Sequence, residues 1–368
     1  MPQSEVRGQR SAVAETTQGG AAPVIVVRNP RVEIIDVFRF FAALWVMLGH
    51  AGPFPLFEGV TKSNVTGLVV RGIYHNLFVG PPAVIVFFVI SGYCIHRPFR
   101  DVAQLPLLSY FTRRYVRILF PMTFAILLAK PVGFPLPLFQ NSILWSLVAE
   151  LIYYTIYPLL RPVAAQIGWR GLIIIAYVLS LVVAATNPSS PDYAGYGVYL
   201  TWLLGLPCWL LGCQLAETHP SDNHVEISLL EIWSWRIGIW VLSTLCSILN
   251  FHSPFVYPWT LNVFAFAVYL WLGKEITFHR NRTTSEVLAW AGLWTYSLYL
   301  THRITMAGYQ LLPVSHQLSP RINWCLEVLL MLAGAYIFYL IFEKPGHILA
   351  RKLARISDPR FIVKQNRP

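Results

Sequence analysis

The side chains with the clearest chemical potential lie in one apolar stretch, which reads R-V-E-I-I-D-V-F-R-F-F-A-A-L-W-V-M-L-G-H from Arg31 to His50. This stretch can enter a bilayer, yet it contains Asp36, Arg39 and His50. An ionisable group inside a membrane costs a few kcal/mol, so it is retained mainly where it has a partner or a task. Arg39 and His50 are about three helical turns apart, roughly 16 Å, and share one face. The spacing predicts a polar track; alternatively, Arg39 reaches a lipid headgroup and His50 marks the helix end.

A second group of candidates is the basic run containing Arg113, Arg114 and Arg117. Arginine suits phosphate because its planar guanidinium donates two hydrogen bonds at once. On a helix, Arg113 and Arg117 are one turn apart and face the same way. The run therefore favours an anion site, and the alternative is a cluster that sets topology and binds lipid headgroups.

Further candidates lie in later apolar segments. Glu150 ends W-S-L-V-A-E, where a buried carboxylate must be paired or protonated. It could orient an imidazole, or it could form a structural bond to a neighbouring helix. His302 is expected at the same depth as His50, and either could be a general base, although a single histidine at a helix end is often structural. Trp145 could stack on a sugar ring, but aromatic residues are common at membrane interfaces.

Composition indicates the elements that must position these residues. The chain has 368 residues, of which 55% are hydrophobic and 12% are charged, and soluble domains carry about twice that charge. The net charge of +11 is spread along short loops and the tail, and the enrichment of Lys and Arg in cytoplasmic loops explains it without nucleic acid. The loop H-P-S-D-N-H-V-E lacks a usual zinc spacing, so no metal is expected. The predicted fold class is all-α, a polytopic membrane protein.

We expect about ten transmembrane helices of near 20 residues each. They fall at roughly 33–50, 78–96, 112–130, 142–160, 171–187, 197–215, 232–250, 255–273, 286–307 and 322–342. The distribution of Lys and Arg places both termini in the cytoplasm. The expected organisation is a disordered cytoplasmic tail at 1–29, a membrane domain at 30–345 and a basic cytoplasmic tail at 346–368.

Six local patterns, in family order, resemble the acyltransferase-3 family of integral-membrane acyltransferases, which modify bacterial surface and secreted polysaccharides among other acceptors. They are D-V-F-R-F-F-A-A-L-W-V-M-L-G-H, F-F-V-I-S-G-Y-C-I, R-R-Y-V-R-I-L-F-P, W-S-L-V-A-E-L-I-Y-Y-T-I-Y-P, Y-S-L-Y-L-T-H and the late E-K-P. The usual R-G-L-D-x-L-R entry reads V-E-I-I-D-V-F-R here, so its first Arg and Gly are absent.

The resemblance implies an acyl-CoA donor on the cytoplasmic side and an essential Arg and His on the first helix. Those two map to Arg39 and His50, and the acidic position of the family maps to Glu150. The basic motif of the family maps to the run at 113–117. The supporting residues expected from these stretches are Asp36, Ser91, Trp145, Tyr296 and His302.

The expected function is transfer of an acyl group, acetyl by default, from cytoplasmic acyl-CoA to a hydroxyl of a surface or secreted polysaccharide or a lipid-linked sugar. Arg39 and the arginines at 113–117 would hold the donor phosphates, and His50 would act as general base or briefly carry the acyl group. Glu150 or His302 could orient His50. The expected partners are the lipid bilayer, acyl-CoA and the glycan, with no bound cofactor, in a bacterial inner membrane.

Two other function classes fit parts of this pattern. Intramembrane Arg, Asp, Glu and His also mark substrate paths, so a transporter or flippase of a glycan or acyl intermediate is the main alternative. A non-catalytic membrane scaffold is a third hypothesis. Release of free CoA thiol separates the enzyme from a carrier, and substitution of Arg39 or His50 separates it from a scaffold.

Overall fold

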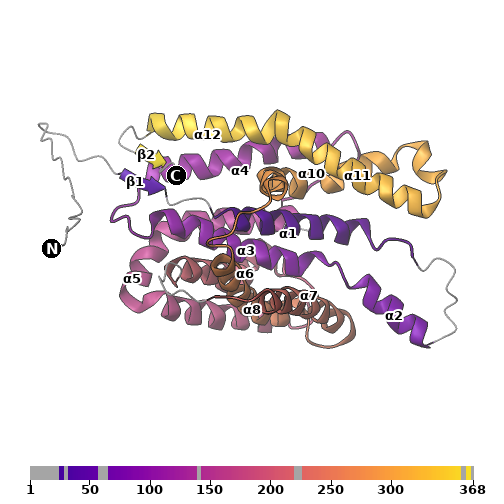
Figure 1. The fold of residues 1–368 in the computed structure, drawn as a ribbon, viewed down its shortest axis with the longest axis horizontal. Coiled ribbons are helices and arrows are strands. Elements are labelled where there is room, and N and C mark those ends of the chain that lie inside the picture. Colours follow the sequence, from indigo (N-terminus) through magenta and orange to yellow (C-terminus); the bar gives the residue numbers. More distant parts are fainter. Residues whose placement is uncertain are drawn as a thin grey trace, which may run out of the picture.

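A computed structural model of the chain describes residues 25–28, 32–56, 65–138, 142–218, 226–357 and 362–365. These residues are almost entirely helical, which confirms the all-α prediction (Figure 1). The longer elements are α1 (Glu33–Ala51), α2 (Val65–His75), α3 (Gly80–His96), α4 (Leu107–Ala129), α5 (Leu144–Thr186), α6 (Gly197–Thr218), α7 (Leu229–His252), α8 (Tyr257–Phe278), α9 (Glu286–Ala291), α10 (Thr295–Gln310), α11 (Pro320–Phe338) and α12 (Lys344–Ser357).

A short parallel strand pair joins the two ends of the described chain. β1 (Ile25–Arg28) pairs with β2 (Ile362–Gln365), and Ile25 lies opposite Ile362. Of the tail expected at 1–29, all but β1 lies outside the described residues, whereas most of the tail expected at 346–368 is described, as α12 and β2.

The helices form two groups with α1 between them (Figure 1). On one side α1 packs against α3, which in turn packs against α6 and α8. On the other side α1 packs against α10, and α10 packs against α11. The helix α12 lies along α4. The first helix is therefore the shared wall of both groups, and its side chains can face a space between them.

Each of the ten predicted spans falls on helical chain. Within the described residues, seven continuous stretches are long and apolar enough to cross a membrane, which indicates a multi-pass membrane protein. One of these stretches is α5, whose 43 residues contain two predicted spans. Gly168 separates them, with φ 77° and ψ 154°, because glycine adopts positive φ without a steric penalty. The count of ten, and the cytoplasmic position of both termini, stay predictions.

Two helices lie where the sequence predicted none. α2 covers part of the expected loop around Arg71, and α12 covers the start of the expected basic tail. The prediction missed them because neither is a continuous apolar span of 20 residues. α12 alternates basic residues with an apolar face, and that face buries Gly346, Ala350 and Ala354. Such a helix is stabilised by packing rather than by its own hydrophobicity.

Helices α3 and α6 approach one another closely through glycine. A Cβ atom added at Gly92 would lie 1.9 Å from the carbonyl oxygen of Trp209. A Cβ added at Gly212 would lie 1.9 Å from the carbonyl oxygen of Val89. Small residues at such contacts let helix backbones pack closely in membranes. This contact fixes α3, which carries Ser91.

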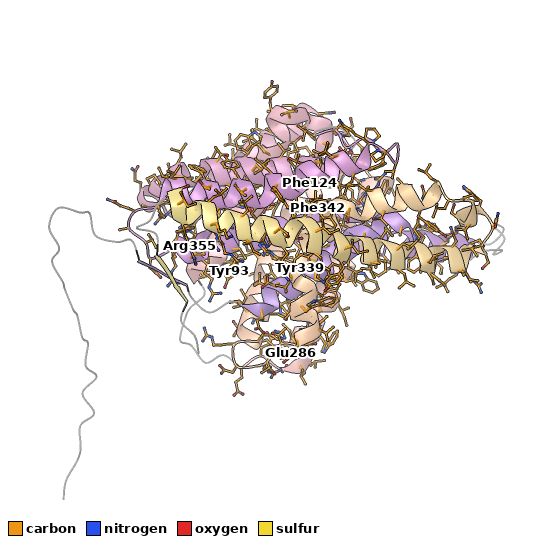
Figure 2. All side chains as sticks on the ribbon, turned by 90° about the horizontal axis from the view of Figure 1, so that it is seen from above. Tyr93, Phe124, Glu286, Tyr339, Phe342 and Arg355 are labelled. Atoms are coloured by element: carbon orange, nitrogen blue, oxygen red, sulfur yellow. The ribbon has the colours of Figure 1, made fainter. Side chains whose placement is uncertain are left out.

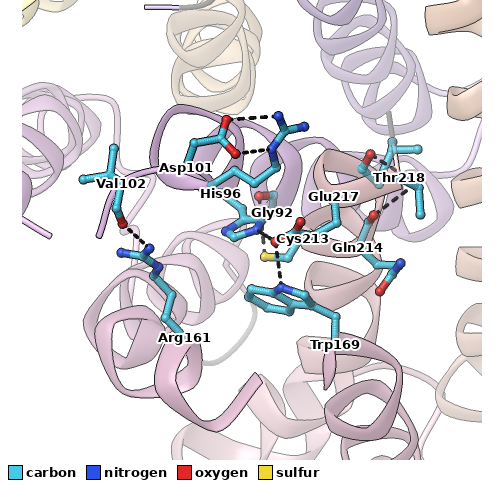
Figure 3. Close-up of polar contacts among 12 residues, drawn as sticks. Gly92, His96, Asp101, Val102, Arg161, Trp169, Cys213, Gln214, Glu217 and Thr218 are labelled. Atoms are coloured by element: carbon cyan, nitrogen blue, oxygen red, sulfur yellow. Dashed lines mark hydrogen bonds and ion pairs between the residues drawn. The ribbon is translucent and has the colours of Figure 1, made fainter. Parts of the chain in front are cut away.

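A polar cluster ties the end of α3 to α5 and α6 (Figure 3). His96 lies 2.8 Å from the hydroxyl of Tyr157 through Nδ1 and 2.6 Å from Oε1 of Glu217 through Nε2. The indole of Trp169 donates to the same Glu217 oxygen at 3.0 Å. All of these groups pair with one another, so we assign the cluster a structural role in holding three helices together.

Candidate active site

A cavity of about 550 Å³ lies among α1, α3, α4, α5, α10 and α12. This volume falls within the range of about 300–1,000 Å³ that is typical of ligand sites. Most of the residues predicted for the site line it: Asp36, Arg39, Ser91, Arg113, Arg114, Arg117, Glu150 and Tyr296. Residues from five distant parts of the sequence therefore meet in one space.

The α1 side of the cavity carries an ion pair. Nη1 of Arg39 lies 3.4 Å from Oδ1 of Asp36, one turn earlier on the same helix. Both side chains are largely buried and both line the cavity. The carboxylate offsets part of the cost of placing the guanidinium there. Arg39 therefore faces the cavity rather than lying isolated among apolar helices.

The α4 side of the cavity is basic. Arg113, Arg114 and Arg117 all line it, and the guanidinium of Arg114 lies 5.7 Å from the centre of the Tyr154 ring. The charges of Arg39 and Arg114 act on Arg117. Guanidinium groups concentrated around a cavity are suited to a ligand with several negative charges.

Glu150 has hydroxyl partners in the cavity wall. Its Oε1 accepts hydrogen bonds from the hydroxyl of Tyr154 and, at 2.5 Å, from Ser91. The indole of Trp209 donates to the Ser91 hydroxyl at 3.3 Å. The partners of Glu150 are thus hydroxyl groups on α3 and α5, not an imidazole. Glu150 and His302 were both considered for orienting His50, and this geometry does not favour Glu150.

His50 and His302 meet at the opposite end of α1. Nε2 of His302 lies 3.0 Å from Nδ1 of His50. Nδ1 of His302 also lies 3.0 Å from the carbonyl oxygen of Leu298, and Nδ1 of His50 lies 2.9 Å from that of Val46. A carbonyl oxygen only accepts hydrogen bonds, so in the neutral rings each Nδ1 carries the proton. Nε2 of His302 then accepts from His50, and Nε2 of His50 keeps a free lone pair.

Aromatic side chains lie between the cavity and the histidines. Phe87 and Tyr299 line the cavity, and their ring centres are 5.7 Å apart. The ring of Tyr299 lies 6.3 Å from that of His302, and its hydroxyl is fixed 2.6 Å from the Ser146 hydroxyl. Neither histidine lines the cavity itself. The track predicted along α1 thus consists of an open basic cavity at Arg39 and, three turns further along α1, a histidine pair that lies one turn beyond Tyr299 on α10.

Arg303 is a neighbour of this pair that the sequence did not single out. Its charge acts on both His50 and His302. The guanidinium carbon lies 5.0 Å from the centre of the Phe134 ring, and Nε is buried without a hydrogen-bond partner. A cation beside a lone-pair nitrogen is suited to stabilising negative charge that develops on a reacting group.

Glu343 is a second residue that the sequence did not assign, although it belongs to the late E-K-P pattern. It is buried, and its Oε2 accepts from the backbone N–H and the hydroxyl of Ser297, at 2.9 and 2.5 Å. It lies in a single turn of π-helix, Tyr339–Glu343, between α11 and α12. Such turns occur frequently at functional sites. Here the turn directs Glu343 into the cavity wall.

Two predicted supporting residues have different surroundings. Tyr296 lines the cavity and donates from its hydroxyl to the carbonyl oxygen of Ile118 at 2.9 Å. Trp145 lies outside the cavity, with its ring 6.2 Å from Phe88 and 5.7 Å from Tyr193. Its contacts are those of a packed aromatic residue. Among the described residues, no group of three or more His, Cys, Asp or Glu is suited to a metal ion.

Comparisons with known proteins give one family and one relative. A family model described as an acyltransferase domain matches residues 32–340. The chain is also 22% identical over 421 residues to a protein of Caenorhabditis elegans named "Regulator of hypoxia-inducible factor 1". That match covers 91% of this chain and 83% of the relative. No solved structure matches the chain.

Proposed function

Because this chain belongs to the acyltransferase-3 family, we propose that it transfers an acyl group, acetyl by default, from cytoplasmic acyl-CoA to a hydroxyl of a glycan or lipid-linked sugar. The proposed location is a bacterial inner membrane. The observation that carries the proposal is the basic cavity beside α1, whose wall on α10 includes Tyr299, one helical turn before His302 of the His50–His302 pair.

The cavity supports the choice of donor. Acyl-CoA has a polyanionic end and a long thin arm, and the arginines of α4 suit the phosphates. Arg39 and His50 are about 16 Å apart along α1, a distance that the extended arm can span. In this proposal the acyl end passes Tyr299 to reach the histidines.

The chemistry proposed at His50 is general-base catalysis. Nε2 of His50 takes the proton of the acceptor hydroxyl as its oxygen forms a bond to the thioester carbon. The resulting tetrahedral intermediate carries an oxyanion, and Arg303 supplies positive charge for it. The intermediate collapses when the carbon–sulfur bond breaks, and the CoA thiolate leaves with the proton held by His50. His302 keeps His50 in the tautomer that leaves Nε2 free.

The test is release of CoA thiol by membranes that contain the protein. Acetyl-CoA is added to membranes of the expressing cell, which hold the natural acceptor, and free thiol is followed with time. The proposal predicts thiol release that depends on the protein and that falls about 10²- to 10⁴-fold in His50→Ala at equal expression. A carrier of a glycan or acyl intermediate would release no thiol. Release that is unchanged in His50→Ala would contradict the assigned base.

A further inference from the structure

We infer that α12 forms the second half of the donor's phosphate site, with Lys344 and Arg351 facing the arginines of α4 across the cavity. This inference rests on the proposed acyl-CoA donor and adds residues beyond the segment that matches the family, which ends at residue 340. It begins from the position of α12. The helix starts directly after Glu343 and contributes Lys344, His347 and Arg351 to the cavity wall.

The packing of α12 on α4 is antiparallel. The hydroxyl of Ser357 lies 3.4 Å from that of Thr112, near the start of α4. Gly346, at the other end of α12, faces Phe120, and a Cβ added there would lie 2.9 Å from that ring. Arg351 lies midway between these two contacts and is therefore level with the part of α4 that carries Arg117. The two helices present their cations to the same depth of the cavity.

Aromatic packing holds the two helices together where α12 begins (Figure 2). The rings of Phe124 on α4 and Phe342 are stacked, with centres 4.4 Å apart. Phe342 also contacts Phe338, with ring centres 4.9 Å apart. These contacts fix the direction in which α12 leaves α11. The backbone of α12, which carries Lys344 and Arg351 as exposed side chains at the edge of the cavity, is thus fixed beside α4.

Positive charge in the cavity exceeds negative charge by a wide margin. Among the described residues, the wall contains seven Arg and Lys side chains against three carboxylates. The cations are Arg39, Arg97, Arg113, Arg114, Arg117, Lys344 and Arg351, and the carboxylates are Asp36, Glu150 and Glu343. The 3′-phosphate of CoA carries about −1.5 to −2 charges, and its diphosphate adds about two more. The excess therefore matches a ligand of this class.

The immediate surroundings of His347 show how the charge is concentrated. The charges of Arg117, Arg351, Arg113 and Arg39 all act on its imidazole. Its Nε2 is buried without a hydrogen-bond partner and lies 3.6 Å from the nearest Glu343 oxygen. The Glu343 carboxylate alone does not balance these four cations, so the arrangement favours a further anion. A phosphate between α4 and α12 would relieve the repulsion and give His347 an acceptor.

A buried hydroxyl in the α4 wall is consistent with the same ligand. Ser109 lines the cavity, is fully buried, and its Oγ has no hydrogen-bond partner. It lies one turn before Arg113 on α4, within the first turn of the helix. The first N–H groups of a helix have no partner within the helix and favour anions. An anion held by α12 and Arg113 would lie where Ser109 can donate to it.

The test measures binding of CoA to the purified full-length protein in lipid nanodiscs. Arg351→Gln is compared with Arg355→Gln, which removes the same charge from the same helix at a residue that does not line the cavity. The inference predicts that Arg351→Gln weakens CoA binding about tenfold or more, while Arg355→Gln binds as the parent does. Arg351→Lys is expected to recover part of the affinity. Lys344→Gln provides a second variant if Arg351→Gln does not fold.

The outcomes separate this inference from the proposed function. Parent protein that binds CoA, with Arg351→Gln and Lys344→Gln equal to it, would overturn the role of α12 and leave the donor standing. Equal weakening by the Arg351 and Arg355 variants would also overturn it, because it would show a diffuse effect of charge. A parent that binds no CoA would overturn the donor and the subsite together.

Discussion

Nδ1 of His50 and Nε2 of His302 lie 3.0 Å apart, although 252 residues separate the two in sequence. The bond joins α1 to α10, one turn beyond Tyr299 in the cavity wall. It gives His302 a defined role, because a ring whose Nδ1 donates to Leu298 can only accept at Nε2. In the proposed mechanism His302 is therefore a positioning residue for His50, which is the base.

The first prediction concerns this positioning. His302→Ala should lower kcat by about 10- to 100-fold with little change in the KM for acetyl-CoA, because the base loses its orientation but the cavity is intact. His302→Gln should recover part of the rate, since the amide oxygen can accept from Nδ1 of His50. The measurement is steady-state thiol release with both variants. Equal kcat for His302→Ala and the parent would contradict the role, and equal loss in both variants would indicate a purely structural residue.

The second prediction concerns the basic wall. Arg114→Gln should raise the KM for acetyl-CoA about tenfold with a smaller change in kcat, because in the proposed complex the guanidinium contacts the donor before and during the reaction. Arg170→Gln, which removes an exposed charge away from the cavity, is the control and should match the parent. Added salt should raise the KM of the parent more than that of Arg114→Gln. A KM that does not respond to either change would place the donor elsewhere.

The third prediction concerns the contact between α3 and α6. Gly92→Ala places a methyl group against the Trp209 carbonyl, so it should destabilise the fold by about 1–3 kcal/mol through overpacking. Gly238→Ala, on α7, has no atom within 4 Å of the added methyl group. It should be neutral or slightly stabilising, because alanine favours the helix. Thermal unfolding in one detergent compares the two variants, and an equal melting temperature would contradict the close approach.

The fourth prediction concerns the buried carboxylate of the π-turn. Ser297→Ala removes one of the two donors to Glu343 and should cost about 1–3 kcal/mol of stability, because a buried oxygen loses a partner. Ser234→Ala is a suitable control, since that hydroxyl is exposed and bonds only to its own helix. The control should change stability by less than about 0.5 kcal/mol. Unfolding of both variants in the same detergent measures the difference in stability between them. Equal stability of the two variants would contradict this role of Ser297.

Much of the fold could be predicted because a membrane span has a simple signal. Every predicted segment is helical since an apolar run of 20 residues has few other options in a bilayer. The same signal missed α12, whose packing depends on a face of small residues such as Ala350 and on α4 as its partner. It also ended the eighth span at residue 273, whereas α8 continues to Phe278 and contains Glu275, whose carboxylate is buried and paired with Arg236 at 2.7 Å.

The site could be predicted in part. Arg39, the arginines of α4 and Glu150 were singled out because charged residues are rare in apolar segments, and the structure gathers them in one cavity. The contribution of α12 could not be predicted, because a basic helix after the last span is typical of any cytoplasmic tail. Arg303 lies near the end of the expected span 286–307 and was not singled out, and only its position next to His302 and its charge near both histidines indicate a role.

The most direct test of the central claim uses acetyl-CoA that is radiolabelled in its acetyl group and measures the label that enters the glycan or lipid fraction of membranes. The parent chain is compared with His50→Ala and Arg39→Ala at equal protein levels. The account predicts label with the parent and loss in both variants, because one removes the base and the other a cation of the donor cavity. Label that persists undiminished in His50→Ala would contradict the claim that this imidazole carries out the transfer.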